Sequence, residues 1–309
     1  LLVSSFFILM QAQAGIVEPI YKQLKDPTTG GQPSTVSMSI TPDGKKMFVL
    51  SHTRNKYYIY DLTTPFDLST MDVSNRSEVD FVGDDPPSAS QIKDIEFNND
   101  GTKVFVFGRN GTLHIHNLTT PYDVASISSS TAVPDDGLDY TTEYGTVSRI
   151  HGVTFNNDGT KMYLSDGTIT STDITQVNLS TPFDPSSGTS TYNLNTESIT
   201  ARYTMDLAFD DDGTRLYLSE SNVGVAINYM YVWKLSNPFE LSSATYVDKW
   251  QILGNGNNLS PYAWTFGNNG MKLYIGTEDA STDGDNIIYE YDLSCPYGIV
   301  LCESETSSV

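Results

Sequence analysis

The amino-acid sequence predicts an all-β fold built from five copies of one unit, and three observations lead to this prediction. The 309 residues are 38% hydrophobic and 11% aromatic, and turn-forming residues are abundant, which is typical of many short strands joined by turns. No long segment after the N-terminus shows an apolar period of 3.6 residues, so long amphipathic helices are not expected. A short turn motif also recurs along the chain at a nearly constant interval.

The recurring motif is an Asp-Gly or Asn-Gly turn between two apolar runs, as in "FNNDGTKVF" at 97–105 and "FNNDGTKMY" at 155–163. Successive turn glycines are 57, 58, 54 and 57 residues apart. These glycines are Gly44, Gly101, Gly159, Gly213 and Gly270. A second motif, Leu-Ser/Thr-x-Pro followed by an aromatic residue, comes after each of them, as in "LTTPF" at 62–66. Self-similarity of two motifs at one period indicates a repeat architecture.

The sequence of each unit predicts four antiparallel strands. The second unit serves as the example for the first three of them. Its first strand ends at Phe97 and turns at 99–101 into the second strand at 103–107, because glycine adopts the positive φ that a tight hairpin requires. The third strand ends where Leu-Ser/Thr-x-Pro begins, since proline cannot donate a hydrogen bond to a strand ladder. A weaker outer strand follows, as at 244–253 in the fourth unit.

Five such sheets can close a ring, so we expect a five-bladed β-propeller of four-stranded antiparallel blades over residues 33–302. The fifth unit shows no clear outer strand before the expected C-terminal tail, residues 303–309. The segment 17–26, within a lead-in at 15–32, resembles the outer strand at 244–253. We therefore expect this N-terminal strand to complete the last blade.

The strings "FNNDGTKMY" and "LSTPFD" resemble the propeller repeats of secreted and surface proteins from bacteria and phages, and more distantly the YVTN and WD40-like superfamilies. The resemblance covers about residues 33 to 300 and implies the propeller fold. It implies no catalytic residue, because the shared motif marks only turns and strand ends, and propellers carry many unrelated activities. The Trp-Asp dipeptides of WD40 repeats are absent, which places the chain outside that subgroup.

The first 14 residues, "LLVSSFFILMQAQA", are apolar and end in Ala12-Gln13-Ala14, the pattern of a secretion signal and its cleavage site. They are too short to span a bilayer as a helix. The alternative is that residues 1–14 are retained and pack between subunits. The signal hypothesis predicts an extracellular or cell-surface protein without a transmembrane span.

The only two cysteines, Cys295 and Cys302, are expected to form a small disulfide loop, as is usual for a close pair in a secreted chain. The chain also contains five sequons for N-linked glycosylation, which would make it a glycoprotein if its source modifies such sites. The candidate glycosylation sites are Asn75, Asn110, Asn117, Asn178 and Asn258.

The formal net charge is −21, from 38 acidic and 17 basic residues. Such a charge repels phosphate backbones and anionic membranes, so nucleic acid is not expected as a partner. A surface glycan or a protein is expected instead, and self-assembly is an open alternative.

We expect a ligand at the rim opposite the turns, where first strands begin and second strands end over the central channel. Side chains there differ from blade to blade, whereas the register positions of the core remain apolar. Unconstrained loops would show the same divergence, so that interpretation stays open. The candidate rim residues are His52, Arg54, Lys93, Arg109, Arg149, His151, Asp166, Arg202, Glu220, Tyr262 and Glu278.

Asp94 and Asp206 share one register position, seven residues before the turn glycine, and are candidate calcium ligands because Ca²⁺ prefers oxygen donors. Asp283 and Asp285, in the acidic loop 278–286, are further candidates. Backbone capping by these carboxylates is the competing interpretation. Calcium is the only cofactor that the sequence suggests, and the expectation is otherwise none.

Three functions are compatible with this sequence. The first is a non-catalytic extracellular propeller for surface binding or adhesion, and the second is a structural subunit of a surface filament. The third is a metal-dependent lactonase or a polysaccharide-cleaving enzyme with a convergent set of ligands. That set would be Asp94, His151, Asp166, Asp206 and Glu220. The chain contains no nucleophile elbow, zinc-protease motif or P-loop, so the first function is favoured.

Overall fold

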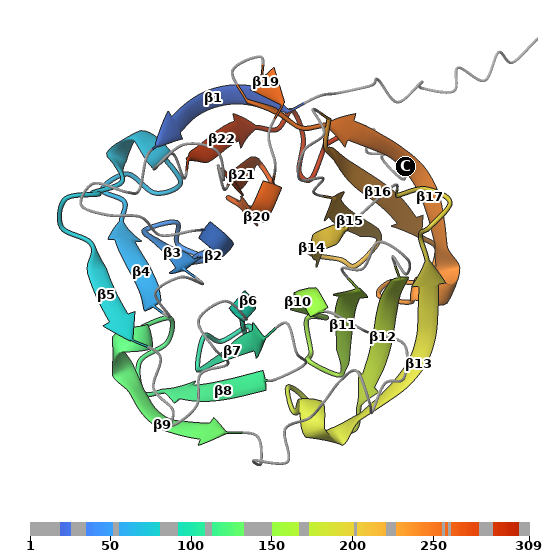
Figure 1. Cartoon of the computed structure of the whole chain (residues 1–309), viewed down its shortest axis with the longest axis horizontal. Helices are drawn as coiled ribbons and strands as arrows, with labels where there is room; N and C mark the ends of the chain where they lie inside the picture. The colour runs from blue at the N-terminus through green and yellow to red at the C-terminus, as the bar shows by residue number, and fades with distance from the viewer. Residues whose placement is uncertain are drawn as a thin grey trace, which may run out of the picture.

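A computed structural model shows a five-bladed β-propeller in which every blade is a four-stranded antiparallel sheet (Figure 1). It describes residues 19–25, 35–51, 56–80, 92–108, 113–132, 150–166, 173–200, 203–220, 227–254, 257–258, 261–277 and 287–302. The predicted signal segment 1–14 and tail 303–309 lie outside these residues. The predicted fold class is confirmed.

Blade 1 consists of β2 (Thr35–Ile40), β3 (Lys46–Ser51), β4 (Lys56–Asp61) and β5 (Ser77–Asp80). Blade 2 consists of β6 (Ile92–Phe97), β7 (Lys103–Gly108), β8 (Leu113–Leu118) and β9 (Ile127–Ala132). Blade 3 consists of β10 (Ile150–Phe155), β11 (Lys161–Asp166), β12 (Asp173–Leu179) and β13 (Gly188–Asn195). Blade 4 consists of β14 (Thr204–Phe209), β15 (Arg215–Glu220), β16 (Tyr229–Leu235) and β17 (Ala244–Gln251).

Blade 5 consists of β20 (Pro261–Gly267), β21 (Lys272–Thr277), β22 (Ile288–Asp292) and the N-terminal strand β1 (Ile20–Lys25). β1 pairs antiparallel with β22, so the two ends of the chain meet in one sheet and close the ring. The prediction that an N-terminal strand completes the last blade is therefore confirmed.

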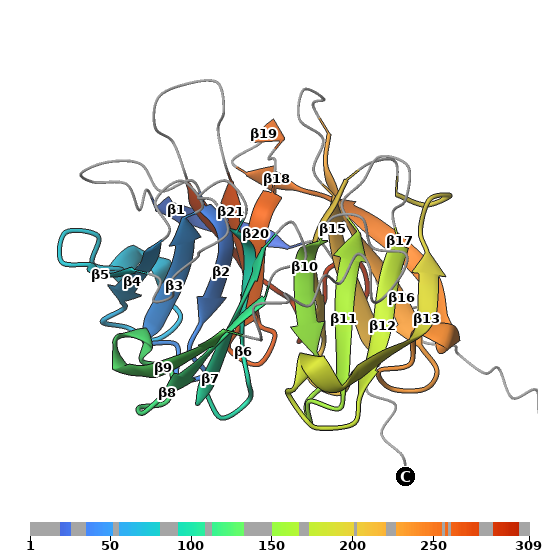
Figure 2. The same cartoon turned by 60° about the horizontal axis from the view of Figure 1, so that its bottom comes forward.

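The remaining elements are short. The strands β18 (Leu253–Gly254) and β19 (Asn257–Asn258) form a small sheet at one rim, opposite the β2–β3 and β10–β11 turns (Figure 2). Four 3₁₀ helices follow the third strands of blades 1 to 4. They are η1 (Leu68–Thr70), η2 (Val124–Ser126), η3 (Pro185–Ser187) and η4 (Leu241–Ser243). No helix in the described part of the chain is long and apolar enough to span a membrane.

The two repeated sequence motifs pack against each other in every blade. The turn glycines have φ between 68° and 76°, and the aromatic residue after each proline also has a positive φ, between 54° and 62°. In blade 3 the backbone N–H of Phe183 donates to the carbonyl of Gly159 at 2.9 Å. A Cβ on Gly159 would lie 2.3 Å from the Phe183 ring, so only glycine allows this contact. This contact explains why the two motifs recur together.

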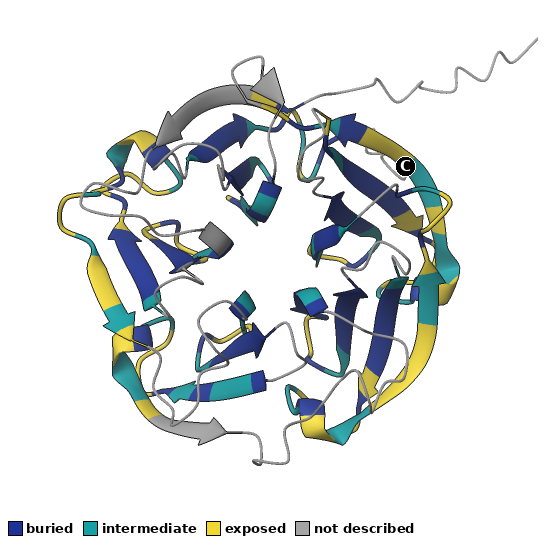
Figure 3. Cartoon of the chain, in the orientation of Figure 1, coloured by how far each residue is buried: buried dark blue, intermediate teal, exposed yellow. Residues whose placement is uncertain are grey.

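The core lies between the blades, and each contact between neighbouring blades, here called a seam, contains one hydrophobic cluster. Described residues of the inner and middle strands are largely buried, whereas the outer strands β5, β13 and β17 are mostly exposed or half-buried (Figure 3). At seam 2–3, for example, Phe105 and Phe107 of blade 2 pack with Val153 and Phe155 of blade 3. Neighbouring blades therefore complete each other's cores, as expected for a repeat protein.

The predicted disulfide is confirmed, since Cys295 and Cys302 are bonded with their Cα atoms 5.9 Å apart. The disulfide closes a short loop directly after β22. β22 is the strand that pairs with β1 to close the ring.

Candidate functional site

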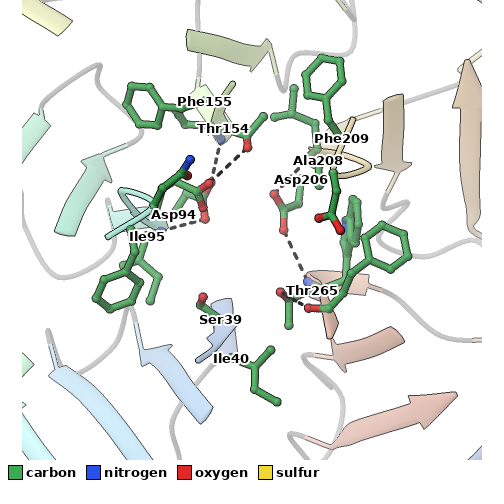
Figure 4. Close-up of a pocket in the computed structure, with 18 of the residues that line it drawn as sticks. Ser39, Ile40, Asp94, Ile95, Thr154, Phe155, Asp206, Ala208, Phe209 and Thr265 are labelled. Atoms are coloured by element: carbon green, nitrogen blue, oxygen red, sulfur yellow. Dashed lines mark hydrogen bonds between the residues drawn. The ribbon is translucent and has the colours of Figure 1, made fainter. Parts of the chain in front are cut away.

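The central channel is lined by the first strand of each blade: β2, β6, β10, β14 and β20 (Figure 1). Five residues before the turn glycines, these strands place Ser39, Glu96, Thr154, Ala208 and Thr265 along the channel wall. Four of these side chains are small, so the channel is not filled. A cavity of about 450 Å³ remains (Figure 4).

Asp94 and Asp206 face one another across this cavity from blades 2 and 4 (Figure 4). Every first strand contains a β-bulge near its start, where the pairing register to the second strand shifts. A bulge re-aims the side chains next to it. The bulges lie beside the position of the two aspartates, which are thus presented on the channel wall.

Asp94 is 4% exposed and accepts hydrogen bonds from three blades. Its Oδ1 accepts from the Ser37 hydroxyl of blade 1 at 2.6 Å and from its neighbour's backbone N–H, that of Ile95, at 2.8 Å. Its Oδ2 accepts from the backbone N–H of Val153 in blade 3 at 2.7 Å. One carboxylate therefore connects blades 1, 2 and 3, which confirms backbone capping as one of its roles.

Asp206 and Glu96 make similar but fewer contacts. Asp206 accepts from the backbone N–H of Leu207 at 2.8 Å and from that of Trp264 in blade 5 at 3.4 Å. Glu96 Oε1 accepts from the Thr154 hydroxyl at 3.2 Å across seam 2–3. Both side chains are half-buried, and their exposed parts face the channel rather than open solvent.

Burial dominates the electrostatics of these carboxyl groups. It raises the pKa of Asp94 to about 7, against the opposing effect of its hydrogen bonds from Ser37, Val153 and Ile95. Burial, with the nearby charge of Asp94, raises the pKa of Glu96 to about 8. Burial and the charges of Asp94 and Glu96 raise the pKa of Asp206 well above its usual range. Among the described lining residues there is no lysine, arginine or histidine to offset these charges.

The cavity opens at the turn rim, where its lining ends in the exposed residues Pro42, Asn99, Asn157 and Asp211. The Asn99 amide donates to the carbonyl of Asn157, and the Asn157 amide donates to that of Asp211 at 2.6 Å. These bonds tie the turns of blades 2, 3 and 4 together. A second hollow of about 200 Å³ lies on the other side of the mouth, between blades 5 and 1. The mouth is therefore asymmetric.

The asymmetry has a sequence origin. Pro42 in blade 1 replaces the asparagine or aspartate that blades 2, 3 and 4 carry two residues before the turn glycine. In blade 5 the turn contains Asn268 and Asn269, both with φ of 52°, before Gly270. Both side chains line the second hollow together with Tyr297. The entrance to the channel thus has the amides of Asn99 and Asn157 and the carboxylate of Asp211 at blades 2 to 4. The second hollow has the amides of Asn268 and Asn269 at blade 5.

Five of the predicted rim residues are described, and they lie at the rim opposite this mouth. Asp166 and Glu220 are buried at the ends of β11 and β15, and His151 Nδ1 lies 3.3 Å from Met205 Sδ in the next blade. Lys93 and Tyr262 are half-buried at the start of β6 and β20. The other six are His52, Arg54, Arg109, Arg149, Arg202 and Glu278, which lie outside the described residues. The rim site stays a prediction.

The predicted metal ligands have a similar outcome. Asp94 and Asp206 share the channel, whereas Asp283 and Asp285 lie outside the described residues. In the part of the chain that the structure describes, no group of three or more His, Cys, Asp or Glu side chains is placed to hold a metal ion. Calcium binding stays a prediction.

Two of the candidate glycosylation sites, Asn75 and Asn178, are exposed, and Asn117 is half-buried. Asn110 lies outside the described residues, and for Asn258 only the backbone is described, in β19. Glycosylation therefore stays a prediction.

Sequence reasoning missed the residues that shape the cavity, namely Glu96, Thr154, Asn99, Asn157 and Asp211. The repeat register contained a usable signal, because these residues stand five or two positions before the turn glycines. Between these two positions lie an apolar one, with Phe97, Phe155 and Phe209, and a polar one, with Asn98, Asn156 and Asp210. Side chains of a strand alternate between its two faces with a period of two residues. Applied to the first strands, this period would have predicted that the side chains five residues before the turn glycines point into the channel.

No protein-family model matches the sequence, and no curated protein matches it. Solved structures show a likeness of fold. A luciferin-regenerating enzyme is 10% identical, with a TM-score of 0.50 over 93% of this chain and 98% of that chain. A functionally unknown protein from Desulfotomaculum acetoxidans is 13% identical, with a TM-score of 0.49 over 84% and 89%. The β-propeller domain of Cps50 (Swd1) from Myceliophteria thermophila is 12% identical, with a TM-score of 0.46 over 89% and 74%.

Proposed function

We propose that this chain is a non-catalytic extracellular binding propeller whose ligand enters the channel at the turn rim. The observation that carries the proposal is the cavity of about 450 Å³, which side chains from all five blades line. Binding sites are usually preformed hollows with apolar walls and a few convergent polar groups. Here Phe155, Phe209 and Trp264 contribute to the walls, and the carboxyl groups supply the polar part.

The lining also limits the class of ligand. Carboxylates and amide oxygens accept hydrogen bonds, and no basic side chain among the described lining residues offers a positive charge. The net charge of −21 repels anions before they reach the mouth. We therefore propose a ligand that donates hydrogen bonds and bears no negative charge, such as a neutral surface glycan or a basic protein segment.

The extracellular location is part of the proposal and is supported by the Cys295–Cys302 disulfide, because such bonds persist in oxidising compartments. The filament alternative rests on residues 1–14, which lie outside the described residues. Light scattering of chains with and without residues 1–14 tests it. Assembly that requires the apolar segment would favour the filament.

Filling the cavity tests the proposed site. Ala208→Phe places an aromatic ring on the channel wall, whereas Ala125→Phe places the same ring on the exposed face of η2 as a matched control. The protein is screened against arrayed neutral and acidic glycans and against basic and acidic peptides. We expect binding of one uncharged or basic ligand that Ala208→Phe weakens at least ~10-fold and Ala125→Phe leaves unchanged.

Binding that survives Ala208→Phe but is lost in Lys93→Ala or Tyr262→Ala would move the site to the opposite rim. Preferential binding of acidic glycans would contradict the ligand class.

A further inference from the structure

The second hollow at the turn rim adjoins the channel cavity. Pro42, Asp211 and Tyr297 line both spaces, and the turn of blade 5 and Phe66 of blade 1 complete the second hollow. Pockets that enclose drug-sized ligands have volumes of about 300–1,000 Å³. The channel cavity of about 450 Å³ lies within this range, whereas the second hollow of about 200 Å³ has room for a smaller group. The mouth of the ring therefore leads to two adjoining compartments of unequal size.

The second hollow owes its aromatic wall to a glycine in blade 5. Three residues before the turn glycine, blades 1 to 4 carry a polar side chain that accepts from a backbone N–H of the second strand, as Asn156 does from Lys161 at 2.8 Å. These side chains are Thr41, Asn98, Asn156 and Asp210. Blade 5 has Gly267 at this position, where a Cβ would lie only 3.0 Å from Tyr274 and 3.2 Å from the Phe66 ring. Gly267 thus lets the Phe66 ring lie against the turn in place of a polar side chain.

The turn of blade 5 also differs from the others in its backbone. In blades 1 to 4 the N–H of the turn glycine closes the turn, as that of Gly159 does by donating to the carbonyl of Asn156 at 3.0 Å. In blade 5 the N–H of Met271 donates instead to the carbonyl of Asn268 at 3.1 Å. Asn268 and Asn269 both have φ of 52°, a left-handed conformation that asparagine tolerates better than most residues. This backbone places two exposed amide side chains at the second hollow.

The two amides at the second hollow have hydrogen-bonding groups available for a ligand. The turns of blades 2 and 3 use their amides to bond the next turn, and this series ends at Asp211, whose carboxylate accepts from the Tyr297 hydroxyl. The side chains of Asn268 and Asn269 make no hydrogen bond to another residue that the structure describes. Both amides can therefore bond a ligand without breaking a contact within the described part of the ring.

The groups around the second hollow match the surface of an uncharged sugar. Each sugar hydroxyl both donates and accepts a hydrogen bond, as the amides of Asn268 and Asn269 do, and the Asp211 carboxylate accepts. The Phe66 and Tyr297 rings provide apolar surface for the C–H groups of a sugar ring. A lysine or arginine side chain can only donate, so it would leave the amide N–H groups without an acceptor. An acidic group would be repelled by the charge of Asp211.

We propose that the second hollow binds one sugar unit of a neutral glycan whose adjacent unit occupies the channel cavity. In this arrangement Asn268, Asn269 and Asp211 bond the sugar hydroxyls, and the rings of Phe66 and Tyr297 contact its C–H groups. The inference rests on the proposed function and narrows it, because it selects a neutral glycan over a basic protein segment. It requires a ligand of at least two linked units, so affinity should rise with the length of the glycan.

Binding of sugars of increasing length to the full chain, measured by NMR titration, tests the proposal. The test ligands are glucose, galactose, mannose and N-acetylglucosamine, their linear homo-oligomers of two to four units, and a tetralysine peptide. We expect the dimer of at least one series to bind at least ~10-fold more tightly than its monomer. The proposal would be overturned if no series gained affinity with length, if no sugar bound, or if only tetralysine bound.

A double variant, Asn268→Gly with Asn269→Gly, assigns the gain to the second hollow. It removes both amides, and glycine adopts the φ of 52° without strain. We expect this variant to bind the dimer as weakly as the monomer, and the monomer within ~2-fold of the wild type. Asn237→Gly, at an exposed amide that is not among the described lining residues of either hollow, is the matched control and should keep the full gain.

The two single variants keep the proposal falsifiable if the double variant folds poorly. Asn268→Gly and Asn269→Gly should each reduce the gain from monomer to dimer at least ~2-fold. An unchanged gain in both would overturn the proposal.

Monomer binding and its dependence on length distinguish this inference from the proposed function. Monomer binding that Ala208→Phe weakens, without a gain for longer chains, would refute only the second subsite. Monomer binding that Ala208→Phe leaves unchanged would refute the channel site and, with it, the arrangement over two compartments. Tetralysine binding that Ala208→Phe weakens, without sugar binding, would retain the channel site and refute the glycan.

Discussion

Asp94 and Glu96 bind protons more tightly in the folded ring than in an unfolded chain, because burial penalises their charged forms. Ordinary carboxyl groups have pKa values of about 4. The stability from a raised pKa is fully present below that unfolded value and is lost as pH rises through the folded value. For these groups the loss occurs between about pH 4 and pH 8 or 9. The acidic channel thus favours the folded state at mildly acidic pH.

Glu96→Gln should therefore raise the melting temperature relative to the wild type by an amount that grows with pH. One unit of pKa shift corresponds to about 1.4 kcal/mol, and each kcal/mol changes the melting temperature by about 2–4 °C in a protein of this size class. We expect the difference between variant and wild type to increase by at least ~3 °C from pH 5 to pH 9 in scanning calorimetry. A difference that stays constant with pH would show that Glu96 does not titrate as described.

Gly159 tests the contact between the two repeated motifs. Its φ of 71° and the 2.3 Å approach of the Phe183 ring to a Cβ leave no room for alanine. Gly159→Ala should destabilise the protein by ~2–4 kcal/mol, through left-handed backbone strain and overpacking. Gly188→Ala, at a φ of −80°, should change stability by less than ~1 kcal/mol. Urea unfolding of both variants provides the comparison, and equal effects would argue against the packing explanation.

At the scale of the elements, tyrosine hydroxyls in the second strands of blades 3, 4 and 5 donate to a backbone carbonyl of the next blade. Adding such a bond at seam 1–2 should stabilise the protein. Phe48→Tyr should place a hydroxyl near the backbone carbonyl of Tyr122, as Tyr163 does for Phe239. A neutral hydrogen bond contributes about 0.5–1.5 kcal/mol. We expect Phe48→Tyr to stabilise the protein by that amount in denaturant titrations and Tyr274→Phe to destabilise it by a similar amount or more. Destabilisation by both variants would mean that seam 1–2 lacks space for the hydroxyl.

The sequence could predict the strands and turns of the propeller but not the contacts between side chains of different blades. Strand order, turns and the closing strand follow from local signals, since glycine, proline and the period of two act within a few residues. The contacts of Asp94 do not, because Ser37 and Val153 are 57 and 59 residues away and meet it only in the closed ring. Sequence register correctly paired Asp94 with Asp206. It could not show whether the two carboxylates capped backbone groups, faced each other or did both.

For the whole molecule, closure of the ring creates the candidate site. The first strands converge because β1 joins blade 5, and four small side chains beside Glu96 leave the channel open. The sequence predicted a site at the rim opposite the turns, and this site stays a prediction because six of the eleven predicted residues lie outside the described part of the chain. The sequence did not predict the cavity at the turn rim. A cavity depends on the space that the side chains of all five blades leave unfilled, and the sequence of a single repeat does not reveal that space.

The most direct test of this account is a hydrogen-exchange footprint of the full chain with the ligand that the glycan and peptide screen identifies. We predict that binding slows exchange at the turn rim, in residues 98–101, 156–159 and 210–213, and that Ala208→Phe abolishes the effect. Protection confined to the opposite rim, at the starts of β6, β10 and β20, would contradict the account and place the ligand at Lys93, His151 and Tyr262.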